Sequence, residues 1–181
     1  MSNKTVVVGM SGGVDSSVSA YLLKKQGFNV IGLFMKNWQS EPGEVCSSEI
    51  DFQDASEVCD ILDIPLHKAN FSDDYWDRVF KQFLLEHKKG RTPNPDILCN
   101  REIKFNSFYD YALKIGADFI ATGHYANVNM TPDNRFYVSK GKDKNKDQSY
   151  ALWGISQKNL SRTMFPLGNL EKTQIRELSL I

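Results

Sequence analysis

The sequence predicts an α/β fold, in which a doubly wound, mostly parallel sheet carries helices on both faces. Short apolar runs alternate along the 181-residue chain with longer segments of helical periodicity, which is typical of parallel βαβ units. The first run, VVV at residues 6–8, is followed directly by the glycines Gly9, Gly12 and Gly13. A buried strand, a tight turn and a helix start are therefore expected in that order at the beginning of the chain.

Eight strands and helices are expected before residue 126. Each strand is a short apolar run, and each helix carries apolar residues at spacings of three and four. In chain order, the expected elements are a strand at 6–8, a helix at 14–25, a strand at 30–35, a helix at 51–62, a strand at 64–68, helices at 73–88 and 103–115, and a strand at 119–122.

Local residues support the boundaries of these elements. Gly27 closes the first helix and Gly116 the last, because glycine readily takes the left-handed conformation that ends a helix. Cys59 lies on the apolar face of the helix at 51–62, which predicts a buried, structural thiol. The polar segment at 36–48 is expected to be a loop, and the RTPNP segment at 91–95 cannot be helix interior, since it contains two prolines.

The pattern changes after residue 126. Two short alternating segments around a polar turn predict a β-hairpin over 127–141, and a basic loop follows at 140–146. Further helical segments are expected near 148–153, 156–163 and 171–180. We expect residues 1–150 to form one α/β domain and residues 151–181 to begin a second, helical domain.

The composition excludes several classes of protein. The chain has 22 Lys and Arg against 22 Asp and Glu, which argues against a uniformly basic nucleic-acid surface but leaves room for local patches. Its three cysteines, Cys46, Cys59 and Cys99, show no disulfide-scaffold spacing, so reduced thiols in the cytosol are expected. No apolar stretch approaches the roughly 20 residues of a membrane span. We expect a cytoplasmic monomer without membrane contact.

The glycine turn predicts a phosphate-binding site. Backbone N–H groups and a helix dipole converge where a strand passes through glycines into a helix. The turn has no Lys before its serine pair, which excludes the G-x-x-x-x-G-K-[ST] loop, and its G-x-x-G-G spacing excludes the dinucleotide fingerprint. The string S-G-G-V-D-S resembles the signature of the PP-loop ATP pyrophosphatases, which implies ATP as ligand. The alternative is a glycine-rich turn without a ligand.

Three further residues are candidates for the same site. Asp15 is unusual beside a polyanion, and either a bridging Mg²⁺ or a helix N-cap role would explain it. Met35 and Gly123 end two expected parallel strands, where ligands of such sheets bind, so both are candidates to contact the adenine or ribose. Met35 could equally be an ordinary core residue.

The segment PNPDILCNREIKF, residues 93–105, is a candidate for cysteine chemistry. Two prolines stiffen a loop that leads through Asp96 to Cys99, which we expect at the start of a helix with Arg101 and Lys104 nearby. A helix N-terminus and nearby cations lower the pKa of a thiol, and the thiolate is the reactive form. The alternative is a buried structural cysteine. Cys46, in the polar loop, is ambiguous.

Several blocks together resemble the tRNA-specific 2-thiouridylase family. They are G-M-S-G-G-V-D-S-S, N-P-D followed by C-N-x-x-I-K-F, A-T-G-H-Y, K-D-Q-S-Y and F-P-L-G, in that family's order. The resemblance implies an adenine-nucleotide α-hydrolase-like fold. It also implies that ATP adenylates the 2-oxygen of the wobble uridine of tRNA, and that sulfur from a cysteine persulfide then replaces this oxygen.

The resemblance also implies residue roles. Cys99 is the nucleophile, which would form a disulfide intermediate, and Asn94, Pro95 and Asp96 meet the target base. Lys146, Asp147 and Gln148 contact tRNA, and Asp15 is the candidate Mg²⁺ ligand. The implied ATP-binding residues are Gly9, Met10, Ser11, Gly12, Gly13, Val14, Asp15, Ser16, Met35 and Gly123.

The chain departs from the family pattern at its end. The family's second cysteine, which carries the persulfide, and its β-rich tRNA-binding domain lie beyond the position that matches Ile181. We therefore expect an N-terminal part of the enzyme, which binds ATP but does not thiolate tRNA alone. A sulfur-relay protein or cysteine desulfurase is the implied partner. The alternatives are another PP-loop ligase and a non-enzymatic nucleotide-binding module.

Overall fold

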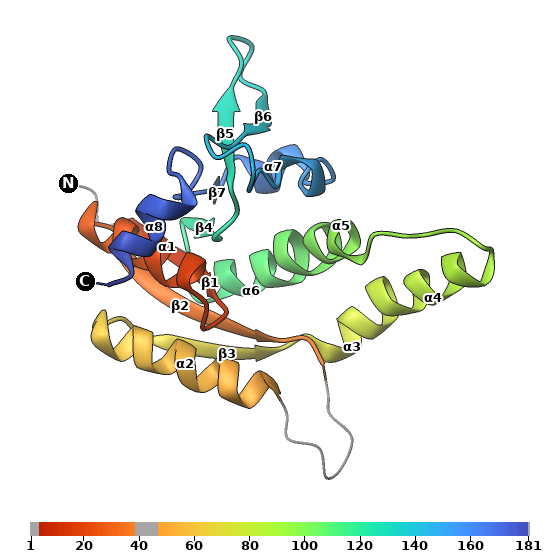
Figure 1. Ribbon diagram of the computed structural model, residues 1–181, viewed down its shortest axis with the longest axis horizontal. Helices are drawn as coiled ribbons and strands as arrows, with labels where there is room; N and C mark the ends of the chain where they lie inside the picture. Colours follow the sequence, from red (N-terminus) through yellow and green to blue (C-terminus); the bar gives the residue numbers. More distant parts are fainter. Residues whose placement is uncertain (1–3, 39–46, 181) are drawn as a thin grey trace.

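A five-stranded parallel sheet forms the centre of the protein in the computed structural model, which describes residues 4–38 and 47–180. The strand order is β3-β2-β1-β4-β7, and every neighbouring pair is parallel, which confirms the predicted fold class. The strands are β1 (Thr5–Met10), β2 (Asn29–Lys36), β3 (Leu66–Asn70), β4 (Phe119–Ala121) and β7 (Thr163–Met164), shown in Figure 1.

Strand β1 lies in the middle of the sheet because both of its faces are apolar. Val6, Val8 and Met10 pack into one hydrophobic cluster, and Val7 packs into the cluster on the other face. None of the four exposes more than 1% of its surface. A continuous β-branched run is favoured in a parallel strand that is covered by helices on both sides.

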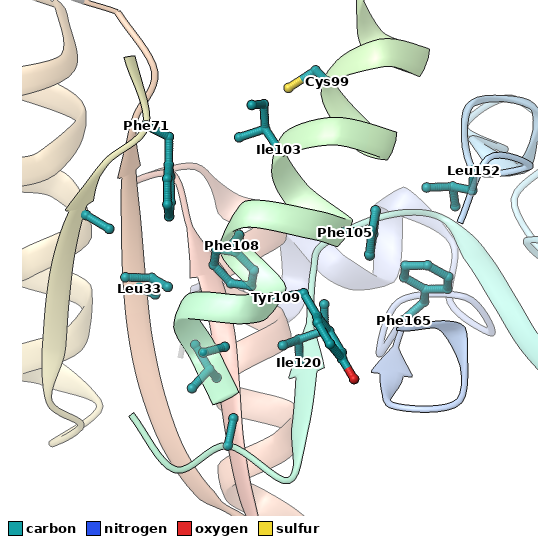
Figure 2. Close-up of a cluster of buried hydrophobic side chains, with 14 of the residues drawn as sticks. Leu33, Phe71, Cys99, Ile103, Phe105, Phe108, Tyr109, Ile120, Leu152 and Phe165 are labelled. Carbon is teal, nitrogen blue, oxygen red and sulfur yellow. The ribbon is translucent and has the colours of Figure 1, made fainter. Parts of the chain in front are cut away.

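Different helices cover the two faces of the sheet. On one face, α1 (Val14–Lys25) and α2 (Ser47–Ile61) contribute Ala20, Leu23, Ala55 and Cys59 to a cluster with β1 and β2. On the other face, the helical segments between residues 72 and 114 contribute the large side chains. They include Val79, Ile103, Phe105, Phe108 and Tyr109, several of which Figure 2 shows packed between the helix and the strands.

Two long helices on the second face each contain a π-helical segment. The first runs through α3 (Ser72–Tyr75), η1 (Trp76–Phe80) and α4 (Lys81–Lys88), and matches the helix expected at 73–88. The second runs through α5 (Pro95–Cys99), η2 (Asn100–Ser107) and α6 (Phe108–Lys114). As Figure 1 shows, α4 leads away from the sheet, and the segment after it returns to α5.

The second of these helices starts earlier than predicted. It begins at Pro95 rather than at residue 103, with Asn94 as its N-cap. Proline lacks an N–H group and fixes φ, so it is unfavourable inside a helix but favoured at the first helical position. The expectation of a helix start beside Cys99 was therefore wrong, because that residue lies a full turn inside the helix.

The predicted hairpin is confirmed as β5 (Ala126–Met130) paired with β6 (Phe136–Lys140). Beyond it lie η3 (Ser149–Ala151), α7 (Gln157–Leu160) and α8 (Lys172–Leu178). The helix expected at 156–163 stops at α7, because Thr163 and Met164 pair with β4 as strand β7.

The last residues of the chain pack against the first helix. Ile175 of α8 and Leu167 join Val18 of α1 and Tyr125 in a small buried cluster. A boundary near residue 150 remains a prediction, and any such division must accommodate these contacts and the pairing of β7 with β4. Within the described residues, no helix is long and apolar enough to cross a membrane.

Candidate functional site

A cavity of about 190 Å³ opens at the carboxyl ends of β1 and β4. The chain continues from β1 to β2 and β3 on one side, and β4 lies on the other, so the strand order reverses here. Ligands of open α/β sheets bind at such a switch point. The cavity is lined by Gly9, Met10, Ser11, Asp15, Ser16, Met35, Lys104, Thr122, Gly123, His124 and Gln148.

The cavity collects most of the residues that the sequence assigned to ATP. Gly12, Gly13 and Val14 are not in its lining; they form the turn into α1 beside it. Gly12 has a φ of +77°, and a Cβ there would lie 2.7 Å from the Asp51 carbonyl oxygen of α2. Glycine is thus required at this position by backbone conformation and by packing.

The N-terminus of α1 has no side-chain cap. Gly13 is the N-cap residue and makes no side-chain cap hydrogen bond. The first N–H groups of a helix have no intrahelical partner, and together with the helix dipole they favour an anion. The turn is held in shape by Ser16, whose Oγ donates to the Gly13 carbonyl at 2.9 Å and accepts from the Ser11 N–H at 3.2 Å. This turn presents donors suited to phosphate oxygens.

Asp15 is held by two partners from distant parts of the chain. Its Oδ1 accepts from Tyr125 Oη at 2.7 Å and from Lys172 Nζ at 2.6 Å. Burial, followed by the hydrogen bond to Asp15, raises the pKa of the Tyr125 hydroxyl. The N-cap alternative for Asp15 was wrong, since Gly13 occupies that position. No group of three or more metal-ligating side chains occurs in the described part of the chain, so a cation here would depend on Asp15 and on phosphate oxygens.

The carboxyl end of β4 brings Gly123 and His124 to the cavity. A Cβ on Gly123 would lie 2.9 Å from the backbone carbon of Asp15, so β4 and the start of α1 touch here. His124 Nδ1 and Thr122 Oγ1 are 2.7 Å apart, and the ring packs against Phe105 and Phe165. Burial, with a smaller contribution from the charge of Lys104, lowers the His124 pKa to about 3. The imidazole is therefore neutral at physiological pH.

Three residues of this lining were not predicted to lie at this site: Lys104, Thr122 and His124. Thr122 and His124 flank Gly123 in the A-T-G-H-Y block, and Lys104 belongs to the C-N-x-x-I-K-F block. The position of a block next to a strand end could have indicated the first two. Nothing local placed Lys104 near the glycine turn, because more than 80 residues separate them in the chain.

A second cavity, of about 420 Å³, contains the segment assigned to tRNA contact. Its lining includes Lys146, Asp147 and Gln148, together with Tyr125 and Lys172. Asp15 and Gln148 line both cavities, so the two are adjacent. Gln148 is fixed there by two hydrogen bonds to the Tyr125 backbone, each 3.1 Å long. The structure thus joins the predicted tRNA segment to the predicted ATP site.

The residues assigned to the target base form the start of α5. The Asn94 side chain accepts a hydrogen bond from the Asp96 N–H at 2.9 Å, and Pro95 occupies the first turn. Asn94 and Asp96 are exposed. Asn94 and Pro95 therefore have a helix-starting role of their own, and base contact by this segment remains a prediction.

Cys99 lies at one end of the apolar cluster, one turn before Ile103, as Figure 2 shows. It is 9% exposed, and burial raises the pKa of its thiol, with Lys104 acting in the opposite direction and Asp96 adding to the rise. The expectation of a lowered pKa was wrong, because the residue lies inside the helix and against the core. Cys59 is buried as predicted, with its pKa raised to about 11 by burial and by Asp60. Cys46 lies outside the described residues.

Comparison with known proteins identifies the family. Residues 4–180 match the family model described as the tRNA methyl transferase HUP domain. The chain belongs to this family. A curated relative, the tRNA-specific 2-thiouridylase MnmA of Francisella tularensis subsp. holarctica, is 55% identical over 180 residues, which are 99% of this chain and 50% of the relative. The chain thus spans about half the length of the curated relatives that it matches.

Solved structures share the fold of this family member at low identity. The U34-tRNA thiolase NcsA from Methanococcus maripaludis is 18% identical, with a TM-score of 0.61 over 98% of this chain and 56% of its own. A 4-thiouridine synthetase, solved as an RNA complex with bound ATP, is 22% identical, with a TM-score of 0.60 over 98% of this chain and 40% of its own. These likenesses establish the PP-loop type of fold.

We expect Cys99 to react with iodoacetamide faster than Cys59 in the folded protein. Both thiols have raised pKa values, but Cys99 is the more exposed, and Lys104 stabilises its thiolate while Asp60 opposes that of Cys59. Mass-spectrometric mapping after limited labelling gives the order, with the unfolded chain as the reference for intrinsic reactivity. Earlier labelling of Cys59 would contradict the assignment of both residues.

Proposed function

We propose that this chain carries the ATP site and one catalytic cysteine of an ATP-dependent tRNA-uridine 2-sulfurtransferase. The observation that carries the proposal is the cavity at the β1/β4 switch point, where the glycine turn, Met35 and Gly123 lie together. Lys104, from the helix that also bears Cys99, lines the same cavity. Membership of the family and 55% identity to 2-thiouridylases support the same conclusion.

The cavity would hold ATP with its phosphates at the N-terminus of α1. The backbone N–H groups of the turn bind phosphate oxygens, and Met35 and Gly123 border the adenosine. A Mg²⁺ ion, when bound, would be held by the Asp15 carboxylate, whose Oδ1 already accepts two hydrogen bonds. The cation would reduce the negative charge of the phosphates.

The proposed chemistry has two stages. The 2-carbonyl oxygen of the wobble uridine, held near Asn94, Pro95 and Asp96, bonds to the α-phosphorus, and pyrophosphate leaves. Sulfur from a cysteine persulfide then attacks carbon 2, and AMP leaves with the oxygen. Cys99 attacks the inner sulfur of the persulfide, which leaves the outer sulfur on the base and a disulfide between the two cysteines. A sulfur-relay protein or cysteine desulfurase would supply the persulfide.

The substrate would be tRNA, with Lys146, Asp147 and Gln148 contributing to its binding from the second cavity. Phosphate contacts dominate the affinity for nucleic acid, and the basic loop at 140–146 supplies cations on a chain whose net charge is zero. The proposed protein is a cytoplasmic monomer with a domain boundary near residue 150.

The proposal is tested by release of pyrophosphate. With Mg-ATP, we expect the chain to release pyrophosphate faster when an unmodified anticodon stem-loop with uridine at the wobble position is added. The matched control is the same stem-loop with 2-thiouridine, which lacks the attacking oxygen. Equal rates with both RNAs would contradict the proposed substrate.

Two other functions give different results in this assay. Another PP-loop ligase would release pyrophosphate only with its own small substrate. A non-enzymatic nucleotide-binding module would bind ATP without releasing any.

A further inference from the structure

Lys104 lies in the wall of the cavity at the carboxyl ends of β1 and β4, and its positive charge can act on a ligand there. The described lining contains two basic side chains, Lys104 and His124, and His124 is neutral because burial lowers its pKa to about 3. The carboxylate of Asp15 is already paired with Lys172. A polyphosphate in this cavity would therefore meet one lysine that belongs to the wall itself.

The helix that carries Lys104 lies on the opposite face of the sheet from α1. The apolar neighbours Ile103 and Phe105 are 0% and 1% exposed and belong to the cluster on that face, whereas α1 contributes to the other cluster. The side chain between them is partly buried and reaches the cavity at the carboxyl edge of the sheet. Lys104 thus approaches the cavity from the side opposite the phosphate-binding turn.

The π-helical segment relates Lys104 to Cys99. Within η2 the backbone bonds run from residue i+5 to residue i, as in the bond from the Phe108 N–H to the Ile103 carbonyl. Because this turn is wider, side chains five positions apart, such as those of Cys99 and Lys104, lie nearer to the same helix face than they would in a regular α-helix. The positive charge of Lys104 also lowers the pKa of the Cys99 thiol, against the larger effect of burial.

We propose that Lys104 binds the α-phosphate of ATP and holds it on the Cys99 side of the cavity. This inference rests on the proposed function, in which the turn before α1 takes the pyrophosphate portion. The reacting α-phosphorus must then lie between the departing pyrophosphate and the incoming base, because the attacking and leaving oxygens are roughly in line. An ammonium group there neutralises the oxygens that stay on phosphorus while the bond to the uridine oxygen forms and pyrophosphate leaves with the electron pair of the breaking P–O bond.

The proposal predicts that replacing Lys104 weakens the binding of ATP, which carries phosphates, but not the binding of adenosine, which carries none. We expect Lys104→Met to weaken ATP binding about 10- to 100-fold, the range for a lost charged hydrogen bond, and to leave adenosine binding within about 2-fold. Lys104→Arg should retain most of the ATP affinity, since it keeps the charge. The control is Lys114→Met, an exposed lysine of α6 on the same continuous helix, which should bind both ligands normally.

Isothermal titration with ATP and with adenosine, after thermal unfolding has shown that each variant is folded, measures both affinities. If Lys104→Met does not fold, Lys104→Gln serves with the same expectation. Equal weakening for ATP and adenosine, or no weakening, would overturn the phosphate role while the proposed function stands. Failure of the unsubstituted chain to bind ATP at all would overturn the proposed function, and the inference with it.

Discussion

Replacing Gly123 by valine is expected to lower the affinity for ATP and to destabilise the fold by about 1–3 kcal/mol, the usual cost of overpacking at a tight contact. A Cβ at this position would lie 2.9 Å from the Asp15 backbone carbon and 3.1 Å from the Asp15 carbonyl oxygen. These are backbone atoms in the first turn of α1, so they can give way only if the helix start moves. The N–H groups proposed to bind phosphate would move with it. Isothermal titration with a non-hydrolysable ATP analogue measures the change.

The control for this substitution is Gly154→Ala. The nearest atoms to a Cβ on Gly154 belong to the Arg101 side chain, at 3.2 Å and beyond, and this flexible side chain can shift. ATP affinity should therefore be unchanged in Gly154→Ala. Normal ATP binding by Gly123→Val, with an unfolding temperature close to that of the unsubstituted chain, would remove the β4 end from the ATP site.

The protein is expected to lose stability steeply as the pH falls from about 6.5 towards 3, because of His124. Its pKa is lowered to about 3 in the folded state, whereas an unfolded chain binds the proton near pH 6.5. Below pH 6.5 the unfolded state therefore takes up a proton that the folded state does not. This contribution to stability is complete above pH 6.5 and falls by roughly 1.4 kcal/mol for each pH unit below it.

Urea unfolding at pH 6.5 and at pH 4.5 measures this effect, which should reach about 2–3 kcal/mol from this histidine alone. His124→Gln should flatten the change, because the amide cannot take up the proton. The matched control is His87→Gln, an exposed position on α4, which should keep the pH dependence of the unsubstituted protein. An identical slope in His124→Gln would show that the imidazole is not held neutral.

Carboxylates act in a different pH range. Hydrogen bonds, led by the Lys172 N–H, lower the pKa of Asp143 below its ordinary value of 3.8. The pKa of Asp147 is also lowered. Burial raises it, but hydrogen bonds donated by Gly141 and Ser149 lower it by more. Stability that depends on these groups is lost only as the pH falls through and below that value. The interval from 6.5 to 4.5 lies above that value, so these two aspartates contribute little to the change measured there.

Local patterns predicted the elements that depend on nearby residues. The VVV run and the glycine turn after it define β1 and the start of α1, since strand burial and turn formation are decided within a dozen residues. In the same way, the alternating pattern of period two predicted the β5/β6 hairpin, and the helical spacing of apolar residues predicted the buried face of α2 that includes Cys59. The start of α5 was also encoded locally, in Asn94 followed by Pro95, but the two prolines were interpreted only as helix breakers.

The sequence by itself determined the α/β class, the glycine turn between β1 and α1, and the resemblance that the family match confirmed. Only the tertiary structure decided which distant side chains share the site. Asp15 meets Tyr125 and Lys172, and Lys104 reaches a cavity that also borders Gln148. The physical reason is that strand pairing and helix packing set these contacts over a hundred or more residues, as the bond between Asp15 and Lys172 illustrates. The same long-range packing buries Cys99 and raises the pKa of its thiol, which no local pattern around it reveals.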